Sequence, residues 1–473
     1  MIANITFELV KINSRTITPT TVHKMKYLLF TATVFCAIVF KSYAQEAPPN
    51  NQTFNFSVQD CINYAYEHQD SVVNAGLDVK SAEYKVKETR GIGLPQVSGS
   101  ATFQDYLKIP TTLLPGEVFG QPAGTFIPVK FGVKYQSSIG ATADQILFDG
   151  SYLVGLKASK TYKELSLKTL TRNKIQISVS VTKAYYQVLV SNEQLRLTDA
   201  NLKQLKQQYD ETVAQNKQGT VEKIDVDRIA VQYNNLVTTR ENTIRSLALN
   251  YQVLKFQMGM PIENALSLKD KLEDIKLDDT ADLAADTSFY HNRIEYSLSE
   301  TGIALKKLDL KRQQSQYLPT LKANASYTSS YQNNSFGNLY KMNFPSSYVG
   351  LTLNIPIFNG WQRLNQVRQS KIAVLKSQND LENAKNGLKL EASQANVAYV
   401  NGLQSLNNQK RNRELAEEVL RVSKIKYQQG VGSSIEVTQA QTSLDDANDK
   451  YIQGLYDALI SKVDLDKAYG RIK

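Results

Sequence analysis

The chain is poor in the residues that build catalytic and metal sites. Its 473 residues include three histidines and two cysteines, and His68 and His291 lie far apart in the sequence. No closely spaced group of histidines and cysteines suits a metal ion, and there is no phosphate-binding glycine-rich loop and no nucleophile motif. We therefore expect no enzyme activity, no metal site and no cofactor, and we interpret both histidines and the scattered acids as solvated or structural.

Dense basic runs are missing as well. The formal net charge is +10, of which the first 44 residues carry +4, so +6 is left for the rest of the chain. Over more than 400 residues this charge is mild. Because no aromatic side chains alternate with a basic run, we expect no nucleic-acid partner.

The first 44 residues have the layout of a secretory signal peptide. Met25-Lys26 is a short basic start, residues 27–40 are mostly apolar, and Ser42 and Ala44 are small residues ahead of a cleavage point. The apolar run is too short to span a bilayer. We expect residues 1–44 to be a signal peptide, with Met25 as an alternative start, and a buried N-terminal strand or helix is the alternative interpretation.

Neither cysteine is expected to carry a lipid or to form an internal disulfide. Lipidation of Cys36 is disfavoured because the bulky Phe35 precedes it, whereas lipoprotein processing requires a small residue there. Removal of the signal peptide would leave Cys61 as the single cysteine. An internal disulfide is then excluded, and packing alone must hold the exported protein together.

One long stretch of the sequence occurs twice. Residues 148–226 and 358–437 each begin with Phe-Asp/Asn-Gly, continue without proline, and end in a Gln-Gly turn followed by Ile, an acid and Val. The two glycines that bound the stretch are 69 positions apart in the first copy and 70 in the second. Such matched spacing indicates a tandem duplication.

Each copy predicts a long helical hairpin. About 68 helical residues at about 1.5 Å per residue would make a rod of roughly 100 Å. A second helix should follow each turn, at 224–257 and 435–469, with Gly219 and Gly430 in the left-handed conformation at the bends. No helix is apolar all round and no strict heptad persists. This polarity suits a curved wall with water on both sides, or alternatively an elongated bundle or coiled coil.

Two predicted strands precede each hairpin, at 96–107 and 135–148 and again at 320–331 and 346–358. The last strand alternates clearly, with Val349, Leu351, Leu353, Ile355 and Ile357 on one face. An apolar face opposite a polar face suits a strand between lipid and water. It also suits a half-buried strand of a soluble protein, which this signal alone favours.

The remaining segments complete the two repeats. Helices are predicted over 54–90 and 292–317, ahead of the strands, and the proline- and glycine-rich segment 110–130 is predicted to be an exposed loop. Residues 261–288 are predicted to be an acidic connector with short elements. We therefore divide the chain into a signal peptide at 1–44, a first structural repeat at 45–260, the connector at 261–288, and a second structural repeat at 289–473.

No apolar segment after the signal peptide is long enough for a transmembrane helix. A chain of this kind can enter a membrane only as strands of a closed barrel. The smallest such barrels have about 8 strands, and this chain is predicted to have four. A membrane location therefore requires several chains to form one barrel together. The alternative is a secreted or surface-attached helical stalk, similar to an adhesin.

Several short motifs, duplicated at this spacing, resemble the TolC-type outer-membrane efflux proteins. They are Tyr-Leu-Pro-Thr-Leu at 317–321, Ile-Pro-Ile-Phe-Asn-Gly at 355–360, Ala-Tyr at 398–399, and Tyr-Gln-Gln-Gly-Val-Gly-Ser-Ser-Ile-Glu-Val at 427–437. The resemblance covers residues 54–473. It implies a mainly α fold with β-strands, in which helical hairpins form an α-barrel and four transmembrane strands per chain complete a 12-stranded trimeric β-barrel.

The resemblance also implies a function and partners. The homotrimer would be the channel or exit duct of a tripartite efflux or type I secretion system in the outer membrane of a Gram-negative bacterium, with a periplasmic helical extension. Its partners would be a periplasmic adaptor (membrane fusion) protein, an inner-membrane pump and outer-membrane lipid.

Site residues follow by matching positions. A periplasmic aperture or gate would include Asp225, Tyr427, Glu436 and Gln439. The helical-hairpin tip, where the adaptor would dock, would comprise Gly219, Thr220, Val221, Gly430, Val431 and Gly432.

Two of these positions depart from the family pattern. Gly432 stands where the best-known member has a gate arginine, and Gln439 stands where it has a second tunnel acid. An arginine lock and a second acidic ring are therefore not expected. Three copies of Glu436 would attract cations, whereas the alternative interpretation is an exposed acid favoured by its helix N-terminus.

Overall fold

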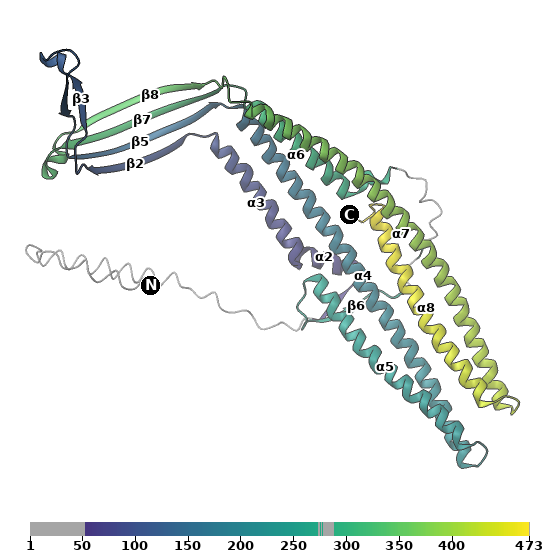
Figure 1. Cartoon of the computed structure of the whole chain (residues 1–473). Helices are drawn as coiled ribbons and strands as arrows, with labels where there is room; N and C mark the ends of the chain where they lie inside the picture. The colour runs from purple at the N-terminus through teal and green to yellow at the C-terminus, as the bar shows by residue number, and fades with distance from the viewer. Residues whose placement is uncertain (1–52, 273–274, 276, 278–287, 473) are drawn as a thin grey trace, which may run out of the picture. The chain divides into compact units, whose positions relative to one another are not determined.

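The computed structural model describes residues 53–472, except for 273–274, 276 and 278–287. The predicted signal peptide and Cys36 lie outside the described residues, as does part of the predicted connector. Residues Phe54–Lys473 form one compact unit. Its two halves repeat one order of elements, a helix, two long strands and a long helical hairpin (Figure 1).

The two helical hairpins are confirmed. The first consists of α4 (Gly150–Lys217) and α5 (Lys223–Met258), and the second of α7 (Gln362–Gln428) and α8 (Ser434–Ala468). With 68 and 67 residues, α4 and α7 are each about 100 Å long. Figure 1 shows both hairpins extending away from the strands.

Local chemistry sets the ends of these helices. Asp149 Oδ1 accepts hydrogen bonds from the backbone N–H groups of Ser151 and Tyr152, at 2.7 and 3.1 Å, and so begins α4. Gly219 and Gly430 have φ values of 77° and 74°, which confirms the predicted left-handed bends.

Shorter helices precede the strands. They are α2 (Val58–His68), α3 (Asp70–Ile92) and α6 (Ile294–Ser315). The predicted helical start at residue 54 is wrong, because β1 (Thr53–Phe56) is a strand that pairs with β6 (Ala265–Leu268). Phe54 and Phe56 pack against the main core, and this long-range burial overrides the local pattern.

The long strands form one antiparallel sheet in the order β2-β5-β7-β8. Their bounds are Gln96–Asp105, Tyr135–Phe148, Thr320–Asn333 and Phe344–Asn354. The fourth strand ends four residues earlier than predicted. Pro356 follows it and has no N–H group to donate to a sheet, so Ile355 and Ile357 lie outside the strand.

The sheet has one apolar face and one polar face, because its register aligns like residues across all four strands. One row contains Val97, Ala143, Ala325 and Val349, whereas another contains Gln96, Asp144, Asn324 and Gly350. The large side chains of the apolar face are exposed in the single chain. They include Val97, Phe103, Ile139, Tyr327, Val349, Leu351 and Leu353.

The predicted loop at 110–130 contains a further hairpin, which corrects the sequence interpretation. Strands β3 (Thr111–Pro115) and β4 (Phe126–Lys130) pair antiparallel around the short helix η1 (Gly116–Phe119). The glycines and two of the prolines of this segment lie in or next to the turn. Pro128 lies within β4, where it is tolerated because each strand of a two-stranded hairpin has an edge that makes no ladder hydrogen bonds. At the same end of the sheet, η5 (Phe336–Lys341) joins β7 to β8.

The helices pack in the sequence α3-α4-α6-α7, and the main core lies where α2, α4 and α5 meet. Cys61 is fully buried in this core, and burial raises the pKa of its thiol to about 12.

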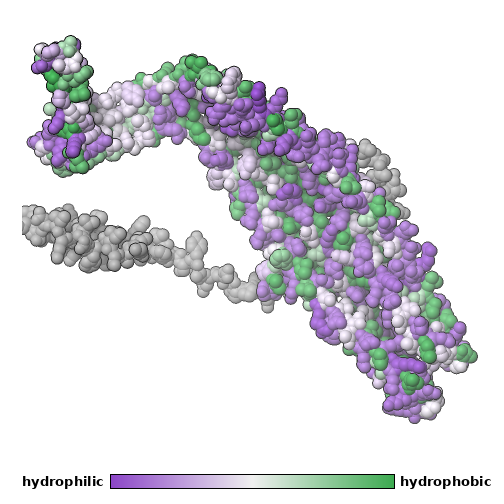
Figure 2. Space-filling view, in the orientation of Figure 1, coloured by the Kyte–Doolittle hydropathy of each residue, from purple (hydrophilic) through white to green (hydrophobic). Residues whose placement is uncertain are grey.

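The helices are polar on their surface. In the described part of the chain no helix combines the length and the apolarity needed to cross a membrane. Figure 2 shows polar residues spread over much of the helical surface in this view.

Candidate functional site

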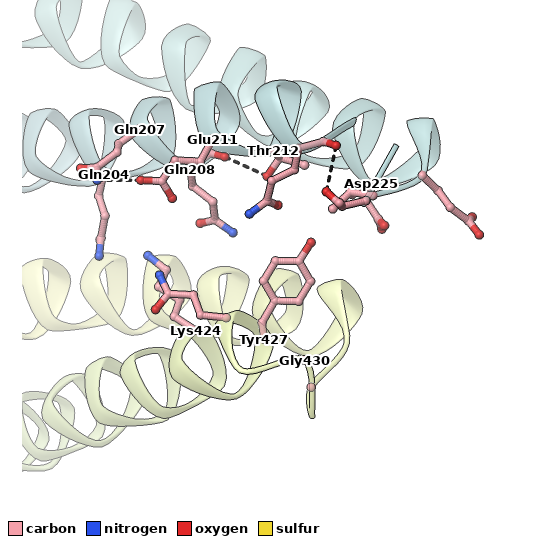
Figure 3. A pocket seen from close by; sticks show the side chains of 15 residues that line it. Gln204, Gln207, Gln208, Glu211, Thr212, Asp225, Lys424, Tyr427 and Gly430 are labelled. Carbon is pink, nitrogen blue, oxygen red and sulfur yellow. Dashed lines mark hydrogen bonds between the residues drawn. The ribbon is translucent and has the colours of Figure 1, made fainter. Parts of the chain in front are cut away.

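The turns of the two hairpins border a common cavity of about 620 Å³ (Figure 3). Six of its lining residues were predicted from the sequence: Asp225, Tyr427, Thr220, Val221, Gly430 and Gly432. The other lining residues are Gln204, Gln207, Gln208, Glu211, Thr212, Gln215, Glu222, Lys424 and Gln428. The predicted tip residues Gly219 and Val431 belong to the same turns but do not line the cavity.

Backbone hydrogen bonds shape the two turns. In the first, the Thr220 N–H donates to the Gln215 carbonyl at 3.1 Å, and Asn216 Nδ2 donates to the Val221 carbonyl at 2.7 Å. In the second, the N–H groups of Val431 and Gly432 both donate to the Lys426 carbonyl, at 3.0 and 3.1 Å. The second turn is therefore closed by its own backbone, and the first by its backbone together with the Asn216 side chain.

Gly432 is in close contact with the end of α7. A Cβ atom at this position would lie 3.0 Å from both Lys426 Cβ and the Tyr427 backbone nitrogen. The turn can therefore hold no side chain at residue 432 without moving.

Asp225 lies in the first turn of α5 and joins the two hairpins. Its side chain is 18% exposed, and its Oδ1 accepts hydrogen bonds from Arg228 Nη1 at 3.2 Å and from the Ser434 hydroxyl of α8. Ser434 was missed in the sequence analysis. A serine at a helix start is common, and nothing local indicates a partner 209 positions away.

Tyr427 faces the first hairpin. In Figure 3 its ring points from α7 toward the helices that carry Thr212 and Asp225. Burial raises the pKa of Tyr427, and the negative charge of Asp225 raises it further. The phenol therefore stays protonated and can donate a hydrogen bond in this cavity.

Lys424 and Gln208 add two further polar groups to the cavity. Burial lowers the pKa of Lys424, although Glu211 partly opposes this shift. Gln208 Oε1 is buried and has no hydrogen-bond partner within the described residues. The cavity therefore offers both hydrogen-bond donors and hydrogen-bond acceptors.

The structure does not place Glu436 and Gln439 in this cavity. Both are exposed on α8, on the side away from the buried Val437 and Ala440. Glu436 has a local role, because Ser433 caps α8 by accepting from the Glu436 N–H at 3.3 Å and donates to Glu436 Oε1 at 3.5 Å. The arrangement of the single chain thus explains this acid as part of a helix cap.

A second polar cavity was not predicted. It has a volume of about 230 Å³ and lies between α4, α5 and α8, where Asp445 and Asp449 are its acidic lining residues. Burial raises the pKa of Asp445 to about 6, and the charges of Asp449 and Asp446 raise it further. Sequence spacing shows the acids of α8 but not the burial that shifts their pKa values.

Comparison with known proteins identifies the family. The family described as "Outer membrane efflux protein" matches residues 61–245 and 306–471. The outer membrane protein TolC of Salmonella enteritidis is 22% identical over 347 residues, covering 71% of this chain and 70% of the relative. Nodulation protein T of Rhizobium leguminosarum bv. viciae is 26% identical over 287 residues, covering 57% of this chain and 55% of the relative.

Solved structures show the same fold. The CusC transmembrane channel superposes with a TM-score of 0.72 at 16% identity, covering 91% of this chain and 95% of that structure. The MtrE outer membrane channel of Neisseria gonorrhoeae superposes with a TM-score of 0.69 at 15% identity, covering 90% and 94%. The chain belongs to the outer membrane efflux protein family and is an outer-membrane protein of Gram-negative type with a periplasmic helical extension.

Proposed function

We propose that three copies of the chain form the exit duct of a tripartite efflux or type I secretion system. One observation carries this proposal, the four-stranded sheet with an uncovered apolar face. Val349 and Leu351 on that face are 86% and 69% exposed. A soluble sheet buries its apolar face against a core, whereas a membrane strand turns that face toward lipid.

The opposite face of the sheet suits the water-filled lumen of such a duct. Its polar side chains bond to one another across the strands, as in the pairs Ser98–Thr142 at 2.8 Å and Thr102–Ser138 at 2.7 Å. Within the described chain, β2 and β8 each have one unpaired edge. Lipid cannot satisfy unpaired backbone groups, so pairing β8 of one copy with β2 of the next would close a barrel of 12 strands from three chains.

The helical hairpins would continue this lumen into the periplasm for about 100 Å. The aperture at their tip would involve Asp225 and Tyr427, with Glu436 and Gln439 facing the tunnel once three copies assemble. The two turns would bind a periplasmic adaptor that connects the duct to an inner-membrane pump. These turns comprise Gly219, Thr220, Val221, Gly430, Val431 and Gly432. In this proposal 1–44 is the signal peptide, 45–260 and 289–473 are the two structural repeats, and 261–288 connects them.

A secreted or surface-attached stalk is the competing function. Such a stalk would leave the apolar sheet face in water, at a cost of about 25 cal/mol for each Å² of apolar surface. Nothing in the described residues covers that face, so the duct is favoured.

The mass of the detergent-extracted protein tests the proposal. Light scattering should give three chains per particle, negative-stain images should show a hollow rod on the order of 100 Å, and planar bilayers should show ion conductance. A monomer that stays soluble without detergent and forms no channel would contradict the duct and support the stalk.

A further inference from the structure

Side-chain hydrogen bonds join the first hairpin to α8 at successive heights. Near the middle of the hairpins Asn201 bonds to Asp445, and nearer the tip Gln232 Nε2 donates to the Thr438 carbonyl at 3.4 Å. The bond between Ser434 and Asp225 lies closest to the turns. It joins the first residue of α8 to the first turn of α5, the two helices that return from the tip.

The position of this bond makes it sensitive to movement of the tip. Both residues directly follow a glycine-containing turn, so a swing of one hairpin away from the other must separate them. Arg228 Nη1 holds Asp225 Oδ1 from within α5, at 3.2 Å, and thereby orients the carboxylate. With the Asp225 side chain only 18% exposed, water competes poorly for it.

Ser434 is not needed to begin its own helix. The neighbouring Ser433 already caps α8, because its hydroxyl accepts from the Glu436 N–H. A serine hydroxyl in the first turn of a helix could equally face solvent. Here it donates to a carboxylate of the other hairpin, and Gly432 leaves the turn itself without a side chain that could do so.

We propose that Ser434 is a positioning residue that holds the tip aperture closed by binding Asp225. This inference rests on the proposed duct function and names the contact that would regulate its opening. A hydroxyl–carboxylate bond is charge-assisted and therefore stronger than a neutral one. It is still a single reversible bond, so a partner that binds the two turns can separate the residues without unfolding either hairpin.

Single-channel recording of the purified full chain in planar bilayers tests the inference. Ser434→Ala should raise the ratio of open to closed time at least about tenfold, as expected for the loss of a hydrogen bond to a charged group. Ser434→Thr keeps a hydroxyl and should restore the wild-type ratio. Ser433→Ala removes the cap of α8 but keeps the contact between Ser434 and Asp225, so it controls for damage to the helix start. Channels of this variant should keep the wild-type ratio of open to closed time.

The outcomes separate this inference from the proposed function. Wild-type channels that conduct, with Ser434→Ala channels of the same open fraction, would overturn the role of Ser434 and leave the duct intact. Failure of both the wild type and Ser434→Ala to conduct at all would overturn both. The double variant Asp225→Cys with Ser434→Cys provides a second test, because the native Cys61 is buried and free. Oxidation should lock its closed state and a reductant should release it, whereas channels that open freely after complete oxidation would contradict the inference.

Discussion

Asn201 of α4 and Asp445 of α8 are joined across the two hairpins, with Asn201 Nδ2 donating to Asp445 Oδ1 at 3.0 Å. Gln441 Nε2 donates to the same oxygen from within α8, at 3.1 Å. Asn201 and Asp445 border the cavity between α4, α5 and α8, and the residues of α4 and α5 that line it are uncharged. The charged groups that act on Asp445 are Asp446 and Asp449 of its own helix and Lys424 of α7. A largely buried carboxylate therefore lies at the junction of the hairpins, mostly among neutral groups.

Asp445 should make the stability of the protein pH-dependent. Its pKa is about 6 in the folded protein against an ordinary 3.8, so the folded state binds this proton more tightly than the unfolded chain. Ionisation of Asp445 therefore lowers the free energy of unfolding. This loss grows as the pH rises from about 4 to 6, and at higher pH it reaches on the order of 3 kcal/mol. Asp445→Asn keeps an acceptor oxygen for Asn201 and removes the charge. We expect it to raise the melting temperature at pH 8 and to leave it unchanged at pH 4.

Asp446→Asn is the matched control for this measurement, because the neighbouring Asp446 side chain is 74% exposed. Thermal unfolding of both variants in detergent should show a pH-dependent gain for Asp445→Asn alone. Equal gains at pH 8 would mean that the total charge of α8, rather than the buried carboxylate, controls stability.

The two faces of the sheet should respond oppositely to a new charge. Leu351 lies on the apolar face and its neighbour Thr352 on the polar face. Leu351→Lys should cost roughly 2–4 kcal/mol if that side chain meets lipid near the bilayer centre, whereas Thr352→Lys should cost little in a water-filled lumen. If three chains assemble as proposed, the yield of folded trimers from isolated outer membranes would measure both effects. Comparable yields for the two variants would count against the assignment of the faces.

The sequence predicted most elements of the fold because their signals are local. Gly219 and Gly430 fix the bends of the hairpins, and strict alternation fixes the strand around Leu351. Pairings between distant segments could not be predicted in this way. Strand β1 depends on β6, more than 200 positions away, and the hairpin β3–β4 was hidden by proline and glycine that usually indicate loops.

In the candidate site, too, the residues with local signals were predicted and those that depend on distant partners were missed. Asp225 and Tyr427 were predicted by position and line one cavity, and both lie close to recognisable turns. Ser434 and Asp445 were missed because their importance comes from partners 209 and 244 positions away and from burial. A single sequence shows residue types and periods, but it does not show which polar groups of two long helices meet.

Gly432 should be intolerant of a side chain. A Cβ atom there would lie 3.0 Å from the Tyr427 backbone nitrogen, so Gly432→Ala must displace the turn, at a cost of roughly 1–3 kcal/mol. Gly155 in α4 is the matched control, since a Cβ atom there meets nothing within 4 Å and Gly155→Ala should stabilise the helix by about 1 kcal/mol. Hydrogen exchange of the amides at 426–437 should be faster in Gly432→Ala and unchanged in Gly155→Ala. Unchanged exchange in both would show that the turn adapts freely.

Glu436 tests whether the assembled tip attracts cations. The side chain is exposed in the single chain and belongs to the cap of α8, through Ser433. Glu436→Gln preserves this cap, because glutamine serves equally well at the third position of a helix, and removes one negative charge per chain. If three copies of Glu436 line the aperture, block of the channel by multivalent cations should weaken clearly in bilayer recordings, because Coulomb attraction falls with the charge. If block is unchanged while the helix remains capped, Glu436 serves only its helix.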